Sequence, residues 1–318
     1  MTQPSLHFLP TKLALSTTLG LLLVVASSVA LAQESLSEIS PAGAVTKVMG
    51  NFSFTEGPAQ ATDGKLYFTD IPETTIYALT SDDELQVFTK QSRHANGLLP
   101  LPGGKLLACE MDGQVVQYDL KSQQRTVLAK TYQGTRFNAC NDLVVDAAGG
   151  IYFTDPLFRA PTPLPQEVQA VYYRSSGGEV TRVTNDLAAP NGIGLSPDGR
   201  RLYVIPSRQA EMLVYDVSAP GKVSGERVFC TLAQPEAKTN TGGDGMALDV
   251  KGNLYITSDL GIQIFSPDGQ PRGIVAVPEK PANVTFGGAD FKTMYMTART
   301  GLYRVEMPIA GYSPLNQK

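Results

Sequence analysis

Six carboxylate or amide side chains recur at a constant distance before short apolar runs of this sequence, and together they could bind a metal ion. The runs begin 10 or 11 residues after the polar residues, at Leu66, Leu106, Ile151, Leu202, Leu254 and Met294. The polar residues are Glu56, Asn96, Asn141, Asn191, Asp244 and Asn283. All six offer oxygen ligands, which suit Ca²⁺ better than a transition metal, with Zn²⁺ and Mn²⁺ as alternatives.

Some of these residues could instead belong to ordinary turns, because Asn96, Asn191 and Asp244 each precede a glycine. Asn-Gly and Asp-Gly pairs are common in turns. Turn chemistry alone need not place all six residues at one offset from a strand, so the constant spacing favours a convergent site. Two carboxylates grouped in a channel of low dielectric constant are unfavourable without a counter-charge, and a divalent cation supplies it.

The elements that would position these residues are short strands of a repeated unit. Successive apolar runs lie 40 to 52 residues apart, a period typical of a β-propeller with four strands in each blade. We therefore predict an all-β, six-bladed propeller over residues 44–308. Residues 44–49 precede the first unit, and we expect them to form the missing outer strand of the last blade, which closes the ring and protects its sheet edges.

The N-terminus is typical of a secretory signal peptide over residues 1–32. One lysine precedes a long apolar stretch that ends in Ala-Leu-Ala at residues 30–32. An uncleaved membrane anchor is the alternative, since about 20 apolar-leaning residues could span a bilayer. We expect cleavage, which leaves a linker over 33–43, a C-terminal tail over 309–318, no stable membrane anchor, and a periplasmic or secreted protein.

Composition argues against several classes of function. The formal net charge is −4 without a basic cluster, which argues against a nucleic-acid partner. His94 is the only histidine outside the N-terminal segment, so a histidine-rich zinc site or a Ser-His-Asp hydrolase is not expected. Of the three cysteines, Cys109 ends an expected second strand and Cys140 precedes a first strand. A disulfide between them is one hypothesis, with Cys230 as a free thiol.

Five short motifs carry a resemblance to a known family over nearly all of residues 44–307. They are Glu56-Gly57-Pro58, Asn141-Asp142-Leu143, Pro190-Asn191-Gly192, Asp244-Gly245-Met246 and the run Asn283–Gly288. With them the sequence resembles the senescence marker protein/gluconolactonase/regucalcin family. The resemblance implies a six-bladed propeller with a catalytic divalent cation, often calcium, that hydrolyses lactones or, in the related diisopropyl fluorophosphatase, organophosphates.

The resemblance also implies a ligand set. The implied metal ligands are Glu56, Asn141, Asn191 and Asp244, with Asn96 and Asn283 supporting them or holding water. Asp244 would either orient and deprotonate the attacking water or act as a ligand only, because a carboxylate bound to a dication is a weak base. Asp142 lies one residue further along a strand than Asn141, hence on the other side, which favours a supporting role.

Three further residues are candidates for substrate contact. Asp155 ends a second strand directly before a proline-rich loop, where it could contact substrate or only cap a turn. Arg136 is similar in position to an arginine that the family places near the substrate, although a solvated surface arginine fits equally well. His94 precedes Asn96 by two residues and could reach the cavity rim, or be structural.

Two loops, 156–167 and 234–243, break the repeat and are expected to act as lids or binding loops. Arg159 stands where the sugar lactonases of the family have a glutamate, and Ala139 replaces their substrate arginine, which argues against a preference for gluconolactone. We predict an exported, calcium-dependent lactone hydrolase. The alternatives are a phosphotriester or fluorophosphate hydrolase on the same site, and a non-enzymatic calcium-binding propeller.

Overall fold

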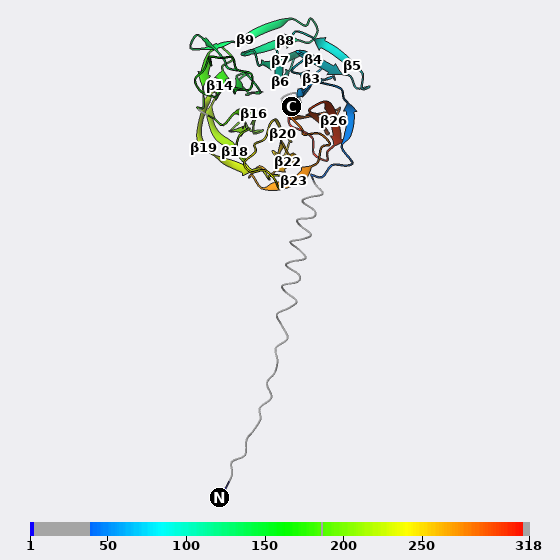
Figure 1. Cartoon of the computed structure of the whole chain (residues 1–318), viewed down its shortest axis with the longest axis vertical. Coiled ribbons are helices and arrows are strands. Elements are labelled where there is room, and N and C mark those ends of the chain that lie inside the picture. The colour runs from blue at the N-terminus through cyan, green and yellow to red at the C-terminus, as the bar shows by residue number, and fades with distance from the viewer. Residues whose placement is uncertain (3–38, 186, 314–318) are drawn as a thin grey trace. The chain divides into compact units, whose positions relative to one another are not determined.

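The chain folds into strands and turns, without helices, in the part that a computed structural model describes, residues 1–2, 39–185 and 187–313. Within that part the strands form six four-stranded sheets and one two-stranded sheet. Figure 1 shows the six larger sheets arranged around a central axis like the blades of a propeller. The predicted all-β, six-bladed fold is therefore confirmed.

Each of the first five blades consists of four consecutive strands. Blade one contains β2 (Thr55–Gln60), β3 (Leu66–Asp70), β4 (Thr75–Leu79) and β5 (Leu85–Thr89). Blade two contains β6 (Ala95–Leu101), β7 (Lys105–Glu110), β8 (Gln114–Asp119) and β9 (Arg125–Ala129). The small sheet of β10 (Thr131–Tyr132) and β11 (Thr135–Arg136) precedes blade three, which contains β12 (Leu143–Val145), β13 (Ile151–Asp155), β14 (Ala170–Arg174) and β15 (Val180–Arg182).

The next two blades follow the same order. Blade four contains β16 (Pro190–Leu195), β17 (Arg201–Pro206), β18 (Glu211–Ala219) and β19 (Lys222–Thr231). Blade five contains β20 (Met246–Leu248), β21 (Leu254–Ser258), β22 (Gly261–Phe265) and β23 (Pro271–Val275).

Blade six joins the two ends of the propeller. It consists of β24 (Asn283–Gly287), β25 (Thr293–Ala298), β26 (Gly301–Glu306) and, as its outer strand, β1 (Thr46–Met49). Strand β1 pairs antiparallel with β26, with Thr46 opposite Arg304 and Lys47 opposite Tyr303. The expected closure of the ring by an N-terminal strand is thus confirmed, and it pairs an edge that would otherwise be open.

The hydrophobic core lies between neighbouring blades. The second strands are buried at every position in β3, β13 and β21, because other blades cover both of their faces, and such strands read as continuous apolar runs. The ring of Phe88 in blade one packs edge-on against Tyr67 of its own blade and Tyr118 of blade two, at centroid distances of 5.4 and 5.7 Å. The outer strand β5 is mostly exposed.

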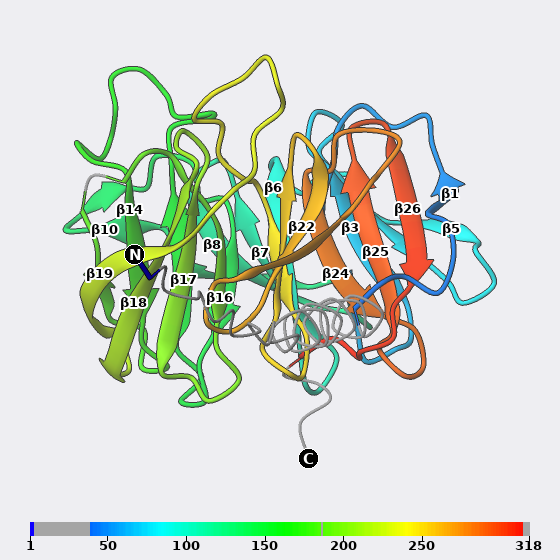
Figure 2. The same cartoon turned by 90° about the horizontal axis from the view of Figure 1, so that it is seen from below.

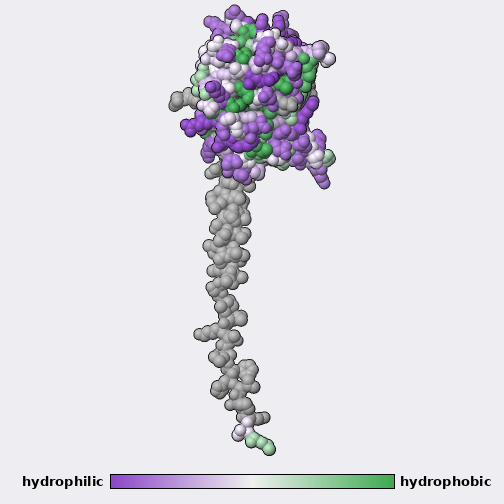
Figure 3. Space-filling model, turned by 90° about the vertical axis from the view of Figure 1, so that its left-hand side faces the viewer, coloured by the Kyte–Doolittle hydropathy of each residue, from purple (hydrophilic) through white to green (hydrophobic). Residues whose placement is uncertain are grey.

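The two irregular loops extend from the same face of the propeller, as Figure 2 shows for 156–167 in green and 234–243 in yellow. The side seen in Figure 3 is mostly hydrophilic, with hydrophobic residues scattered over it. Among the described residues, none belongs to a helix that could span a membrane by its length and apolar character. Apart from its first two residues, the expected signal segment 1–32 lies outside the described residues.

Candidate functional site

A cavity of about 240 Å³ lies where the first strands of the blades begin. Five of the six predicted residues, one from each of blades one to five, line it. These are Glu56, Asn96, Asn141, Asn191 and Asp244. Four of them are buried, and Asp244 is partly exposed. The structure therefore brings five oxygen-bearing side chains together around one space.

The glycines beside these residues allow neighbouring blades to approach closely. Gly97 lies within β6 and Gly192 within β16, so the turn interpretation is wrong for these two positions. The Gly97 N–H donates to the carbonyl of Asn141 at 2.8 Å, and the Gly192 N–H to the carbonyl of Asp244 at 2.9 Å. A Cβ atom on Gly192 would lie 2.5 Å from that carbonyl oxygen. Only glycine fits here, and its hydrogen bond fixes one site residue relative to the next blade.

A threonine of the second strand makes a further bond between blades. The Thr69 hydroxyl donates to the carbonyl of Asn96 at 3.2 Å, and the Thr154 hydroxyl to the carbonyl of Asn191 at 2.9 Å. Thr257 bonds in the same way to the strand start of blade six. The recurring threonine of the LYFTD and IYFTD runs thus positions the backbone of a site residue in the following blade, and that of LYITS positions Ala282, directly before Asn283.

Burial disfavours the charged forms of the two carboxyl groups of the site. Burial, followed by repulsion from Asp244, raises the pKa of Glu56 well above its ordinary value. Burial also raises the pKa of Asp244 to about 6, against the lowering effects of nearby Lys280 and of a hydrogen bond from Asn191. That bond joins Asn191 Nδ2 to Asp244 Oδ1 at 2.5 Å. A cation between the two carboxylates would favour their charged forms.

The amide of Asn96 offers an independent test of whether a metal fits. Its Oδ1 atom is buried and has no hydrogen-bond partner, whereas buried polar atoms almost always have one. Among the described residues, no group of three or more His, Cys, Asp and Glu side chains is placed to hold a metal, so a cation here would depend on amide oxygens. Calcium accepts amide oxygens and irregular geometry. The residues therefore fit a hard divalent cation.

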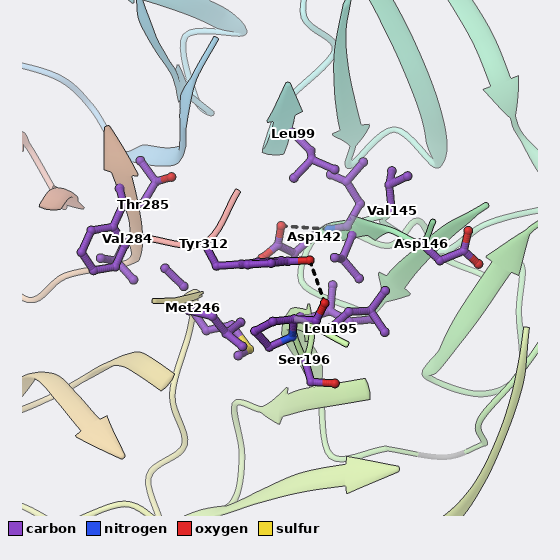
Figure 4. Close-up of a pocket in the computed structure, with 18 of the residues that line it drawn as sticks. Leu99, Asp142, Val145, Asp146, Leu195, Ser196, Met246, Val284, Thr285 and Tyr312 are labelled. Carbon is purple, nitrogen blue, oxygen red and sulfur yellow. Dashed lines mark hydrogen bonds between the residues drawn. The ribbon is translucent and has the colours of Figure 1, made fainter. Parts of the chain in front are cut away.

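The sixth predicted residue, Asn283, lies between this cavity and a second one. Its side chain lies near the carboxyl groups of Glu56 and Asp142 and helps to lower the pKa of each, against the larger raising effect of burial. Asn283 and Asp142 line a cavity of about 380 Å³ further along the first strands, and Figure 4 shows Tyr312 lying in it. The Tyr312 hydroxyl donates to the carbonyl of Pro197 at 3.2 Å. Asp142 therefore faces away from the smaller cavity, on the side expected for a supporting residue.

Two predicted substrate residues bond to the backbone instead. The carboxylate of Asp155 is fully buried and accepts the N–H groups of Asn138 and Ala139 at 2.8 and 2.7 Å. The guanidinium of Arg136 donates to the carbonyls of Phe137 and Asn138. Neither side chain lines the smaller cavity. Both side chains satisfy the polar backbone of the segment that leads to Asn141, which favours a structural role, and substrate contact by either stays a prediction.

His94 has the contacts of a structural residue, and the cysteines are not bridged. The His94 ring is 2.9 Å from Asp112 through Nδ1 and 3.0 Å from Arg159 through Nε2, and it does not line the smaller cavity. Cys109 and Cys140 are buried free thiols, so the disulfide hypothesis is wrong. The Cys109 Sγ donates to the carbonyl of Asp142 at 3.5 Å, which gives the thiol a partner within the core.

Comparison with known proteins agrees with this geometry. The sequence pattern of the SMP-30/Gluconolactonase/LRE-like region matches residues 54–300. The chain belongs to this family. Similar proteins include a gluconolactonase of Zymomonas mobilis, which is 28% identical over 83% of this chain and 81% of its own length. A pentonolactonase of Haloferax volcanii is 29% identical over 77% of this chain and 81% of its own length.

Solved structures of the family have the same fold. A gluconolactonase from Xanthomonas campestris is 26% identical, covers 83% of this chain and 89% of its own, and superimposes with a TM-score of 0.76. A calcium-binding regucalcin from Agrobacterium tumefaciens is 20% identical over 87% and 98%, with a TM-score of 0.73. Because the regucalcin is only 20% identical to this chain, the similarity shows a shared fold alone.

Two residues near the cavity depart from what the family resemblance implies. Ala139 stands where the resemblance implies a substrate arginine, and it packs in an apolar cluster with Ile71 and Met111. Arg159 stands where a sugar-contacting glutamate is implied, and it bonds to His94 rather than lining the cavity. The part of the cavity wall formed by Ile71 and Met111 is apolar.

Sequence reasoning missed the side chains of this wall. Ile71 and Met111 line the cavity, and each directly follows the last residue of a second strand, which could have identified them. Phe158 comes from the 156–167 loop, while Gly242 and Gly243 come from the 234–243 loop. Lys280 also lines the cavity and belongs to no repeat. The repeat could therefore not have indicated it.

Proposed function

We propose that this protein is a calcium-dependent hydrolase that opens a lactone ring in the smaller cavity. The observation that carries the proposal is the convergence of two carboxylates and three amides on one space of about 240 Å³. Glu56, Asn141, Asn191 and Asp244 would hold the cation, with Asn96 supplying its unpaired oxygen directly or through water. The names of the family relatives, a gluconolactonase and a pentonolactonase, support lactones as the substrate class.

The cation and Asp244 would have different roles in the hydrolysis. When bound, Ca²⁺ polarises the lactone carbonyl and stabilises its developing negative charge. Asp244, held by a hydrogen bond from Asn191, would orient a water molecule and take its proton as the oxygen attacks the carbonyl carbon. The ring C–O bond then breaks, and the proton passes to the leaving alkoxide. The product is a hydroxy acid.

The test combines a substrate panel with a substitution at Asp244. With Ca²⁺ present, the wild type should hydrolyse lactones, and a chelator should abolish turnover until Ca²⁺ is restored. Asp244→Asn should lower kcat by about 10²–10⁴-fold, the usual contribution of a general base. Asp216→Asn is the matched control, since that carboxylate is exposed and pairs with Arg227 on the outer strands. Saturating Ca²⁺ should also raise the Tm of the wild type, because binding at 100 times Kd stabilises by about 2.7 kcal/mol.

Each of the other outcomes would support a different function. Hydrolysis of phosphotriesters without hydrolysis of any lactone would favour the phosphotriesterase alternative. A calcium-dependent rise in Tm without any turnover would favour a non-enzymatic propeller. Full activity of Asp244→Asn would remove Asp244 from the proton transfer.

A further inference from the structure

The wall of the smaller cavity is mainly apolar above the oxygen ligands. Four large apolar side chains line it, two of them at the ends of second strands and one on the 156–167 loop. They are Phe54, Ile71, Met111 and Phe158. Ala139, fully buried, packs behind Ile71 and Met111. An apolar substrate body would fill this space, since burying apolar surface is favourable in proportion to its area.

The hydroxyl groups that line the cavity are already engaged. Ser207 Oγ donates to the carbonyl of Gly243 and accepts from Asn191. Ser258 Oγ donates to the carbonyl of Gly261, and the Thr257 hydroxyl donates to backbone carbonyls. A lactone with several hydroxyl groups would leave many of them without partners on this wall. Unpaired buried polar groups are strongly unfavourable, so the wall disfavours a polyhydroxylated ring.

Positive charge gathers at the mouth despite the net negative charge of the chain. Lys280 lines the cavity and pairs with Asp259, which also accepts Lys238 at 2.9 Å. Two lysines thus share one carboxylate. Arg299, in the turn between β25 and β26, lies with its guanidinium 5.0 Å from the centre of the Phe54 ring. Lys280 lines the cavity directly, and Arg299 lies over a ring that lines it, so both charges are at its edge.

We propose that the substrate is a lactone with a compact apolar body and a carboxylate substituent, which Lys280 binds, rather than a polyhydroxylated sugar lactone. The inference rests on the proposed lactonase function and specifies its substrate class. With a divalent cation offsetting Glu56 and Asp244, the lysine pair and Asp259 leave an excess of positive charge at the mouth. A lysine with three N–H donors can bond to Asp259 and to a substrate carboxylate at the same time.

The test uses two lactones that differ only at one ring substituent, 5-oxotetrahydrofuran-2-carboxylate and its methyl counterpart γ-valerolactone, with glucono-1,5-lactone as the polyhydroxylated comparison. For the wild type, kcat/KM should be about tenfold or more higher for the carboxylate lactone than for the methyl one, and lowest for gluconolactone. Lys280→Gln should reduce the carboxylate-to-methyl ratio about tenfold, the effect of one charge-assisted hydrogen bond. Lys238→Gln, which removes the other partner of Asp259, should leave this ratio within about twofold.

Binding of the ring-opened dicarboxylate product, measured by calorimetry, provides a readout without turnover. Lys280→Gln should weaken this binding about tenfold, and Lys238→Gln should not. A wild-type preference for gluconolactone, or equal effects of the two lysine variants, would overturn the inference while leaving lactonase activity intact. If no lactone is hydrolysed, the proposed function fails, and product binding still decides the role of Lys280.

Discussion

Substituting Gly192 by alanine should show how strongly the site depends on close contact between blades. The added Cβ would lie 2.5 Å from the carbonyl oxygen of Asp244 and 3.0 Å from Ile205 Cδ1. Ordinary contacts of this kind begin at 3.4 Å, so backbone must move by roughly 0.9 Å. The shift also strains the hydrogen bond from the Gly192 N–H to Asp244.

The close contact of the added Cβ and the strained hydrogen bond together determine how much stability is lost. Overpacking of a core costs about 1–3 kcal/mol, and the loss of a hydrogen bond costs about 0.5–1.5 kcal/mol. Alanine also reduces the conformational entropy of the unfolded chain, which offsets this loss of stability by about 0.4–1 kcal/mol. At the middle of these ranges the free energy of unfolding should fall by about 2 kcal/mol, which corresponds to a decrease in Tm of about 4–8 °C at 2–4 °C per kcal/mol. Lactone turnover should fall as well, because Asp244 moves with its carbonyl.

The assay is thermal unfolding followed by circular dichroism, with lactone turnover measured on the same samples. Gly177→Ala is the matched control, because the nearest atom to its added Cβ is 3.8 Å away and its φ is not positive. This variant should melt within about 3 °C of the wild type and keep its turnover. If Gly192→Ala behaves like Gly177→Ala, the bonds between blades do not hold the site residues in place.

Two more substitutions test how single side chains stabilise the propeller. Thr154→Val removes the hydroxyl that donates to the buried Asn191 carbonyl and should lower the free energy of unfolding by about 1–3 kcal/mol. Thr154→Ser keeps the hydroxyl and should lower the free energy of unfolding by less. Equal Tm values of the two variants would show that this hydrogen bond does not stabilise the propeller. Burial raises the pKa of Asp155 to about 7, so ionisation opposes folding and stability should fall as pH rises from about 4 to about 7. Asp155→Asn should reduce that slope by up to about 1.4 kcal/mol per pH unit, measured by urea unfolding; an unchanged slope would contradict the assignment.

The sequence repeat was sufficient to predict the fold and the residues around the smaller cavity, because each blade uses the same local chemistry. The repeat does not distinguish structure from catalysis, however. Asp70 accepts the N–H groups of Ser53 and Phe54 in the same way that Asp155 accepts two backbone donors, so the recurring carboxylate at the end of the second strand is structural. Its position beside the cavity suggested substrate contact, and only the hydrogen-bond partners reveal its role.

The parts that could not be predicted are those that do not repeat. Lys280 and Phe158 come from connecting segments whose paths depend on the whole fold, and no spacing indicates that both line one cavity. The backbone of the candidate ligands is fixed by hydrogen bonds between blades, such as the one from Gly97 to Asn141, whereas the wall consists mainly of side chains on turns and loops. Substitutions in the wall can therefore change the shape and charge of the substrate site without disturbing the bonds that hold the ligand set.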